Sequence, residues 1–109
     1  MSGKIKLSKV GSIPVVKLSG EFTTQKTPEL SKKMQTLTTE GHKVIAIDMS
    51  EAAYLDSYCL GVFVYSWKML REGGCELVFL SPSDFVRDLL DETKLSQVIK
   101  VVENLDRFE

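Results

Sequence analysis

The segment from Tyr54 to Gly61 is the part of the sequence best placed to carry chemistry. It brings Ser57 to the expected start of a long helix, directly after Asp56. Both residue types are good helix N-caps, because their side-chain oxygens accept hydrogen bonds from the first-turn amides. From the residue types alone, this structural role is the favoured interpretation of both side chains.

The same position of Ser57 also suits a phosphate. A helix N-terminus offers backbone N–H groups and partial positive charge, which stabilise an anion attached there. A phosphoryl group adds about −1.5 to −2 charges at neutral pH. Next to Asp56 this charge would repel a protein docked on the same surface, and a penalty of a few kcal/mol weakens binding about a thousandfold. Ser57 is therefore a candidate switch.

The remaining acidic and histidine residues give little support to catalysis. His42 is the only histidine, and its expected place in a turn indicates a solvated side chain. Asp48, Glu51 and Asp56 could form an acidic magnesium site, but solvated carboxylates at strand ends and turns are the simpler interpretation. Glycine-rich phosphate-binding motifs do not occur in the sequence. We therefore expect no cofactor, no metal and no enzymatic activity.

The two cysteines do not form a recognisable motif. Cys59 and Cys75 lack C-x-x-C spacing and are expected on different elements, which supports neither a redox dithiol nor a metal site. A thiol near a helix N-terminus can be reactive, so redox sensing by Cys59 is a further alternative. Apolar neighbours more often make such a cysteine an inert part of the core.

Composition limits the class of protein further. The 109 residues fit one domain, 1–109, and 14 basic against 15 acidic residues give a net charge of −1. This near balance argues against direct nucleic-acid binding, which usually needs a clustered basic surface. The sequence has no apolar run typical of a signal peptide or a membrane span, so we expect a cytoplasmic protein without membrane insertion.

Strands and helices are expected to alternate along most of the chain. Polar and apolar residues alternate in the first expected strand, a turn at residues 11–12 leads to the second, and the next two are apolar almost throughout. The expected strands are 4–9, 13–19, 43–48, 75–80 and 98–102, with residues 49–56 as a connection. The expected helices begin at Thr27, with its hydroxyl as N-cap before Pro28, at Ser57, and after Ser83; they end near Gly41, at residues 71–74 and near Asp91.

The spacing of apolar residues assigns a buried face to each helix. These faces are Leu30, Met34 and Leu37 in the first helix, Leu60, Val64, Trp67 and Leu70 in the second, and Phe85, Val86, Leu89 and Leu90 in the third. The element order predicts an α/β fold with a mixed, mostly parallel sheet of about five strands, an N-terminal β-hairpin and three to four helices.

In its element order and motifs, the sequence resembles the STAS domain family of anti-sigma factor antagonists. Residues 47–50 (Ile-Asp-Met-Ser) and 54–61 (Tyr-Leu-Asp-Ser-Tyr-Cys-Leu-Gly) are similar to the family's D-[LM]-S strand end and its D-S-[SA]-G-L-G helix start. Residues 18–22, 73–77 and 81–95 resemble its L-x-G-E-L, G-G-x-L and S-P-x-V-x-x-L-L-x-x-x-x-L stretches. The resemblance extends from Lys4 to Val102.

The resemblance implies a STAS-like fold and a partner-switching function. In the family, the serine directly after the motif aspartate is phosphorylated, which here is Ser57. The unphosphorylated antagonist binds an anti-sigma factor, often itself a serine kinase, and so releases a sigma factor. Phosphorylation ends that binding, and a phosphatase restores it. The residues implied in partner binding are Asp56, Ser57, Tyr58, Cys59, Leu60, Gly61, Glu21 and Thr23.

Three residues depart from the family pattern. Tyr58 replaces a small residue, Cys59 replaces a glycine, and Thr23 replaces an aspartate. Tyr58 places a large ring beside the acceptor serine, where it could obstruct a kinase or form part of a divergent docking face. An alternative therefore stays open: a constitutive STAS scaffold or accessory module, of the stressosome or lipid-transport type, in which Ser57 is not phosphorylated.

Overall fold

An antiparallel hairpin begins the fold, as the alternation near the N-terminus predicts. The computed structural model describes residues 3–108, and its first strands are β1 (Lys4–Val10) and β2 (Ile13–Phe22). They pair in antiparallel register and are joined at Gly11, whose φ of 60° lies in the left-handed region that glycine favours. Pro14 lies near the start of β2, where the missing N–H is tolerated.

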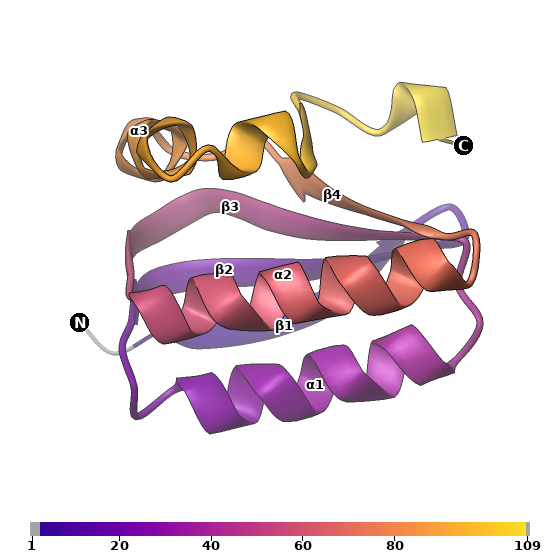
Figure 1. The fold of residues 1–109 in the computed structure, drawn as a ribbon, viewed down its shortest axis with the longest axis horizontal. Coiled ribbons are helices and arrows are strands. Elements are labelled where there is room, and N and C mark those ends of the chain that lie inside the picture. Colours follow the sequence, from indigo (N-terminus) through magenta and orange to yellow (C-terminus); the bar gives the residue numbers. More distant parts are fainter. Residues whose placement is uncertain (1–2, 109) are drawn as a thin grey trace.

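Three further strands complete a mixed sheet, as the element order predicts. They are β3 (Val44–Leu55), β4 (Glu76–Leu80) and β5 (Lys100–Val102). The strand order is β1-β2-β3-β4-β5, and every pair after the hairpin is parallel. This arrangement confirms the predicted fold class (Figure 1).

The prediction of a connection over residues 49–56 is wrong, because β3 continues to Leu55. Its second half pairs with β2 from Ser19 to Phe22, with register shifts after Lys17 and after Gly20. These shifts place extra residues in β3, so its buried side chains do not alternate in the regular way. The bulges explain why this half of the strand does not have the period of two that a sequence pattern can detect.

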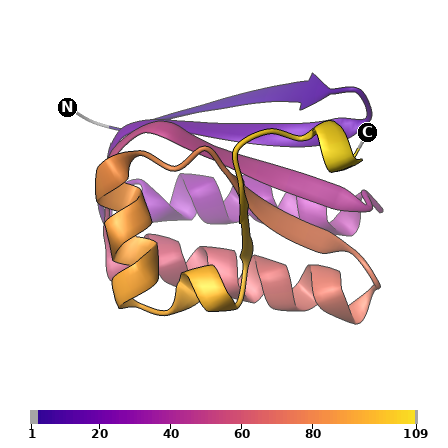
Figure 2. The same ribbon diagram turned by 90° about the horizontal axis from the view of Figure 1, so that it is seen from above.

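Helices α1 (Thr27–Thr39) and α2 (Ser57–Glu72) pack side by side on one face of the sheet (Figures 1 and 2). Helix α3 (Asp84–Glu92) packs against β3 and is followed by the short helix η1 (Leu95–Gln97). A last short helix, η2, covers Asp106–Phe108. None of the helices within residues 3–108 has the length and apolar character that a membrane span requires.

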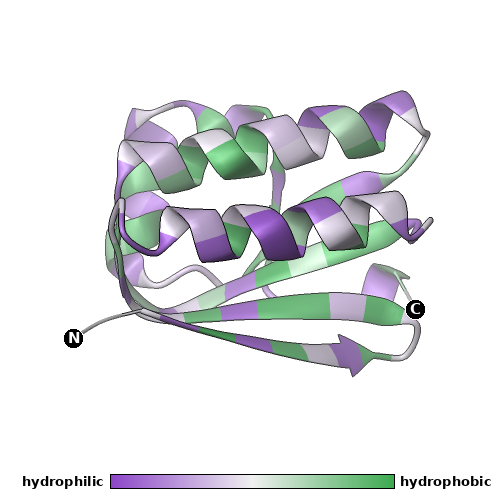
Figure 3. Ribbon diagram, turned by 90° about the horizontal axis from the view of Figure 1, so that it is seen from below, coloured by the Kyte–Doolittle hydropathy of each residue, from purple (hydrophilic) through white to green (hydrophobic). Residues whose placement is uncertain are grey.

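The helix faces correct part of the sequence-based prediction. In α2, Leu60 and Leu70 are buried as expected, but Val64 is 36% exposed and Trp67 only partly buried. The core is instead filled by Cys59, Phe63 and Ser66. In α3, Val86 and Leu90 are buried, whereas Phe85 is 48% exposed and does not belong to the core face. Figure 3 shows strands with many hydrophobic residues beneath helices in which hydrophilic and hydrophobic residues alternate.

Most of the helix ends agree with those predicted from the sequence. Gly41 follows α1 with a φ of 84°, and Ser83 caps α3 by accepting a hydrogen bond from the backbone N–H of Val86. The prediction of Thr27 as N-cap is wrong: the N-cap of α1 is Lys26, without a side-chain bond. Thr27 lies inside the helix, where its hydroxyl donates to the carbonyl oxygen of Thr23 at 3.3 Å.

Candidate functional site

The end of β2 and the start of α2 meet at the end of the sheet where the parallel strands β2 and β3 finish. Because β2 and β3 are parallel, their last residues, Phe22 and Leu55, are paired neighbours. The backbone N–H of Asp56 then donates to the carbonyl oxygen of Phe22 at 3.0 Å. This contact brings the loop between β2 and α1 next to the first turn of α2.

Asp56 joins that loop to the helix through both carboxylate oxygens. Its Oδ1 accepts a hydrogen bond from the backbone N–H of Cys59 at 3.1 Å, which caps α2. Its Oδ2 accepts from the hydroxyl of Thr24 in the loop, at 3.2 Å. The N-cap of α2 is therefore Asp56, and the capping role that the residue types allowed for Ser57 is not used.

Ser57 is the first residue of α2, and its side chain is exposed. Among residues 3–108, none of the side-chain hydrogen bonds involves its hydroxyl group. The first-turn amides place partial positive charge at this end of the helix. The geometry thus offers a solvent-facing hydroxyl at a position where the helix favours an attached anion.

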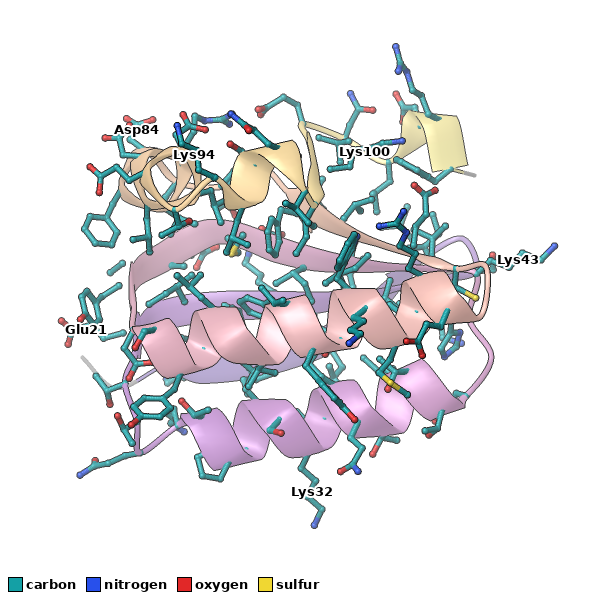
Figure 4. All side chains as sticks on the ribbon, viewed as in Figure 1. Glu21, Lys32, Lys43, Asp84, Lys94 and Lys100 are labelled. Atoms are coloured by element: carbon teal, nitrogen blue, oxygen red, sulfur yellow. The ribbon has the colours of Figure 1, made fainter. Side chains whose placement is uncertain are left out.

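The other residues implied in partner binding divide into an exposed and a buried set. Tyr58 is 64% exposed. Gly61, Glu21 and Thr23 are also exposed, while Asp56 is partly buried. Figure 4 shows Glu21 at the end of the molecule where α2 begins. The side chains of the remaining two, Cys59 and Leu60, point into the core, so a partner docked on this surface would not reach them.

The environment of Cys59 does not suit a reactive thiol. Its side chain is fully buried, and its sulfur lies 3.5 Å from the Thr27 hydroxyl and 3.7 Å from the Phe22 carbonyl oxygen. Burial raises the pKa of the Cys59 thiol, the hydrogen bond with Thr27 opposes that shift, and the charge of Asp56 adds to it. A raised pKa keeps the thiol protonated near neutral pH, which argues against redox sensing.

Three exposed aromatic residues around this surface were not predicted. Tyr54 and Phe85 are 42% and 48% exposed, and their ring centroids lie 6.0 Å apart. Tyr65 lies two turns after Tyr58 on α2 and is 65% exposed. Val86 and Leu90 are four residues apart and share the buried side of α3. The helical spacing of this pair could have indicated that Phe85, one residue before Val86, lies off that side. Exposed aromatic side chains are common at the centres of protein interfaces.

The acidic residues weighed as a magnesium site have separate partners. Asp48 accepts hydrogen bonds from the backbone N–H and hydroxyl of Ser50, at 2.9 and 2.8 Å. Glu51 forms an ion pair with Lys17 across β2 and β3. Within residues 3–108, no three acidic, histidine or cysteine side chains are grouped so that they could hold a metal ion.

Replacing Asp56 tests its role in joining the loop to the helix. We expect Asp56→Ala to lower the free energy of unfolding by about 1 kcal/mol, because it removes the cap of α2. Asp56→Asn should retain most of that stability, since the amide oxygen can still accept the bond from Cys59. Urea denaturation measures both variants. Equal stability of wild type and Asp56→Ala, or an equal loss in both variants, would contradict the assigned role.

Comparisons with known proteins agree with this architecture. The STAS domain model matches residues 4–107. The anti-sigma-B factor antagonist of Listeria monocytogenes is 33% identical over 84 residues, which cover 77% of this chain and 74% of the relative.

Solved structures show the same fold. An anti-sigma factor antagonist from Mycobacterium paratuberculosis superposes with a TM-score of 0.80 at 22% identity, covering 97% of this chain and 90% of that one. The Bacillus cell fate determinant SpoIIAA in its phosphorylated form gives a TM-score of 0.78 at 19% identity, with 97% and 100% covered.

The mixed sheet, with two helices on one face and a capped α2 beside the β2–α1 loop, defines the architecture of a small α/β domain. The chain belongs to the STAS domain family. The match confirms the resemblance found in the sequence. Anti-sigma factor antagonists are regulators rather than enzymes, in agreement with the expectation that this chain has no catalytic activity.

Proposed function

We propose that this chain is an anti-sigma factor antagonist that works by partner switching, controlled by phosphate on Ser57. Without phosphate, the surface around the start of α2 binds an anti-sigma factor and so releases a sigma factor. A phosphate on Ser57 ends that binding. The observation that carries the proposal is the exposed Ser57 hydroxyl at the positive end of α2, beside the carboxylate of Asp56.

The charges at this surface support the switch. A phosphate on Ser57 adds about −1.5 to −2 charges next to a residue that already carries one. The fold tolerates this charge because the side chain faces solvent at a helix N-terminus. A docked protein would have to desolvate both anions, and a charge buried at an interface without a compensating partner costs several kcal/mol. That penalty weakens binding about a thousandfold.

The proposed partners follow from the same reaction. They are an anti-sigma factor that is also a serine kinase, and a phosphatase that acts on phosphorylated Ser57, all in the cytoplasm. Two relatives support the proposal: the Listeria protein is named an anti-sigma-B factor antagonist, and SpoIIAA has this fold in a phosphorylated form. The exposed ring of Tyr58 beside the acceptor favours the alternative, a constitutive STAS module without phosphate.

Mass spectrometry distinguishes the two. In protein isolated from its native cells, we expect a species heavier by about 80 Da, the mass of one phosphoryl group, in at least one growth condition. Fragmentation should place the group on Ser57, and a chromosomal Ser57→Ala variant should lack it. Its absence under every condition, or its placement on another residue, would favour the constitutive module.

A further inference from the structure

Gly61 lies inside α2 although contacts within the chain do not require a glycine there. Apart from its chain neighbours and the backbone of α2 itself, a Cβ atom built on Gly61 would meet no heavy atom of residues 3–108 within 4 Å, and its φ is not in the left-handed region. In a helix interior, glycine is less favourable than any residue except proline. Alanine would therefore suit α2 better, and contacts among the described residues do not account for the glycine.

The space above Gly61 belongs to a groove between α1 and α2. The groove has a volume of about 370 Å³. Tyr58 and Tyr65 flank Gly61 at three residues before and four residues after, which places all three on one side of the helix. Both rings are about two-thirds exposed. The α1 side of the groove presents hydroxyl and amide groups, including those of Ser31 and Gln35.

None of the residues that line this groove is charged. This is unusual for a surface of a chain in which 27% of the residues are charged. An uncharged groove with two exposed aromatic side chains suits a neutral partner segment with an apolar side chain, because tyrosine is enriched where binding energy concentrates. A highly charged segment would lose its hydration here without gaining an ion pair.

We propose that this groove receives the anti-sigma factor of the proposed function, on which this inference rests. A neutral segment of the partner places an apolar side chain between Tyr58 and Tyr65 and approaches the backbone of α2 at Gly61. The groove is continuous with the Ser57 surface, since Tyr58 follows Ser57 in the same helical turn. The phosphate would then act at the rim of an interface whose uncharged centre is the groove.

Substitution of Gly61 separates binding from stability. We expect Gly61→Ala to raise the thermal midpoint by about 4 °C, because alanine favours the helix. The same variant should weaken binding to the anti-sigma factor about tenfold, since one added methyl group overpacks the contact. Gly61→Leu, which fills the groove, should weaken binding about a hundredfold or more. Opposite changes in stability and affinity are not expected from a purely structural glycine.

Isothermal titration of these variants against the anti-sigma factor that binds the wild type gives the affinities. Tyr65→Ala should also lose about tenfold or more in affinity. Val98→Leu, which adds bulk at an exposed position outside α2 and outside the groove, should bind as the wild type does.

The outcomes separate this inference from the proposed function. Wild-type affinity in Gly61→Leu, together with lost binding in Ser57→Asp, would overturn the groove and leave the proposed function standing. A lower thermal midpoint in Gly61→Ala would also overturn the inference, because glycine would then have a structural role. If the wild type binds none of the anti-sigma factors of its source organism, the proposed function fails and this inference fails with it.

Discussion

Ser57→Asp should weaken binding to the anti-sigma factor by about a hundredfold or more, because a charge buried at an interface without a compensating partner costs several kcal/mol. The substitution adds one negative charge beside Asp56, at an exposed residue of the surface proposed to bind the partner. A phosphate should have a larger effect, since it carries more charge. Isothermal titration against the anti-sigma factor measures the loss.

The fold should not change in this variant. An acidic residue in the first turn of a helix is favourable, so the thermal midpoint of Ser57→Asp should equal or exceed that of the wild type. Ser57→Ala should bind normally, because Asp56 and not Ser57 caps α2. Ser12→Asp is a matched control: it adds the same charge in the exposed β1–β2 turn, at the opposite end of β2. Equal affinities of Ser57→Asp and Ser12→Asp would contradict the proposed switch.

Phe63→Ala should produce the largest loss of stability among the substitutions considered, about 3–5 kcal/mol in the free energy of unfolding. Phe63 lies on the opposite side of α2 from the proposed docking surface and is fully buried. Its ring packs edge-on against Phe79 of β4, with 5.6 Å between the ring centroids. Alanine would leave a cavity between the helix and the sheet.

Urea denaturation checks this prediction, and Phe85→Ala is its control. Phe85 loses the same side chain from a position that is 48% exposed, so its variant should lose no more than about 1 kcal/mol, as surface substitutions usually do. Similar losses in both variants would show that α2 does not anchor the core through Phe63. The stability loss expected for Phe63→Ala and the binding loss expected for Ser57→Asp assign the two faces of α2 different roles, one in stability and one in binding.

The elements that could be predicted from the sequence are those with strong local signals. The hairpin follows from the alternation before Gly11 and the turn at that residue, and the start of α2 follows from Asp56 next to Ser57. The second half of β3 could not be predicted, because two register shifts against β2 remove its alternation. In α2, the buried face is rotated toward Cys59 and Phe63, because the helix packs against both the sheet and α1.

The candidate site shows the same limit. The position of Ser57 at the helix start is a local property, and it was predicted together with its possible phosphate. The bond between Thr24 and Asp56 joins residues 32 positions apart, so it depends on the parallel pairing of β2 and β3. The groove above Gly61 likewise exists only because α1 packs beside α2. Neither feature has a signal in a single stretch of sequence.

The most direct test compares one protein in two covalent states. Protein phosphorylated stoichiometrically on Ser57 and the same sample after phosphatase treatment are each titrated with the anti-sigma factor. We expect the dissociation constant to be about a thousandfold higher for the phosphorylated state, and treatment to restore tight binding. Equal dissociation constants in the two states would show that phosphate on Ser57 does not control the partner.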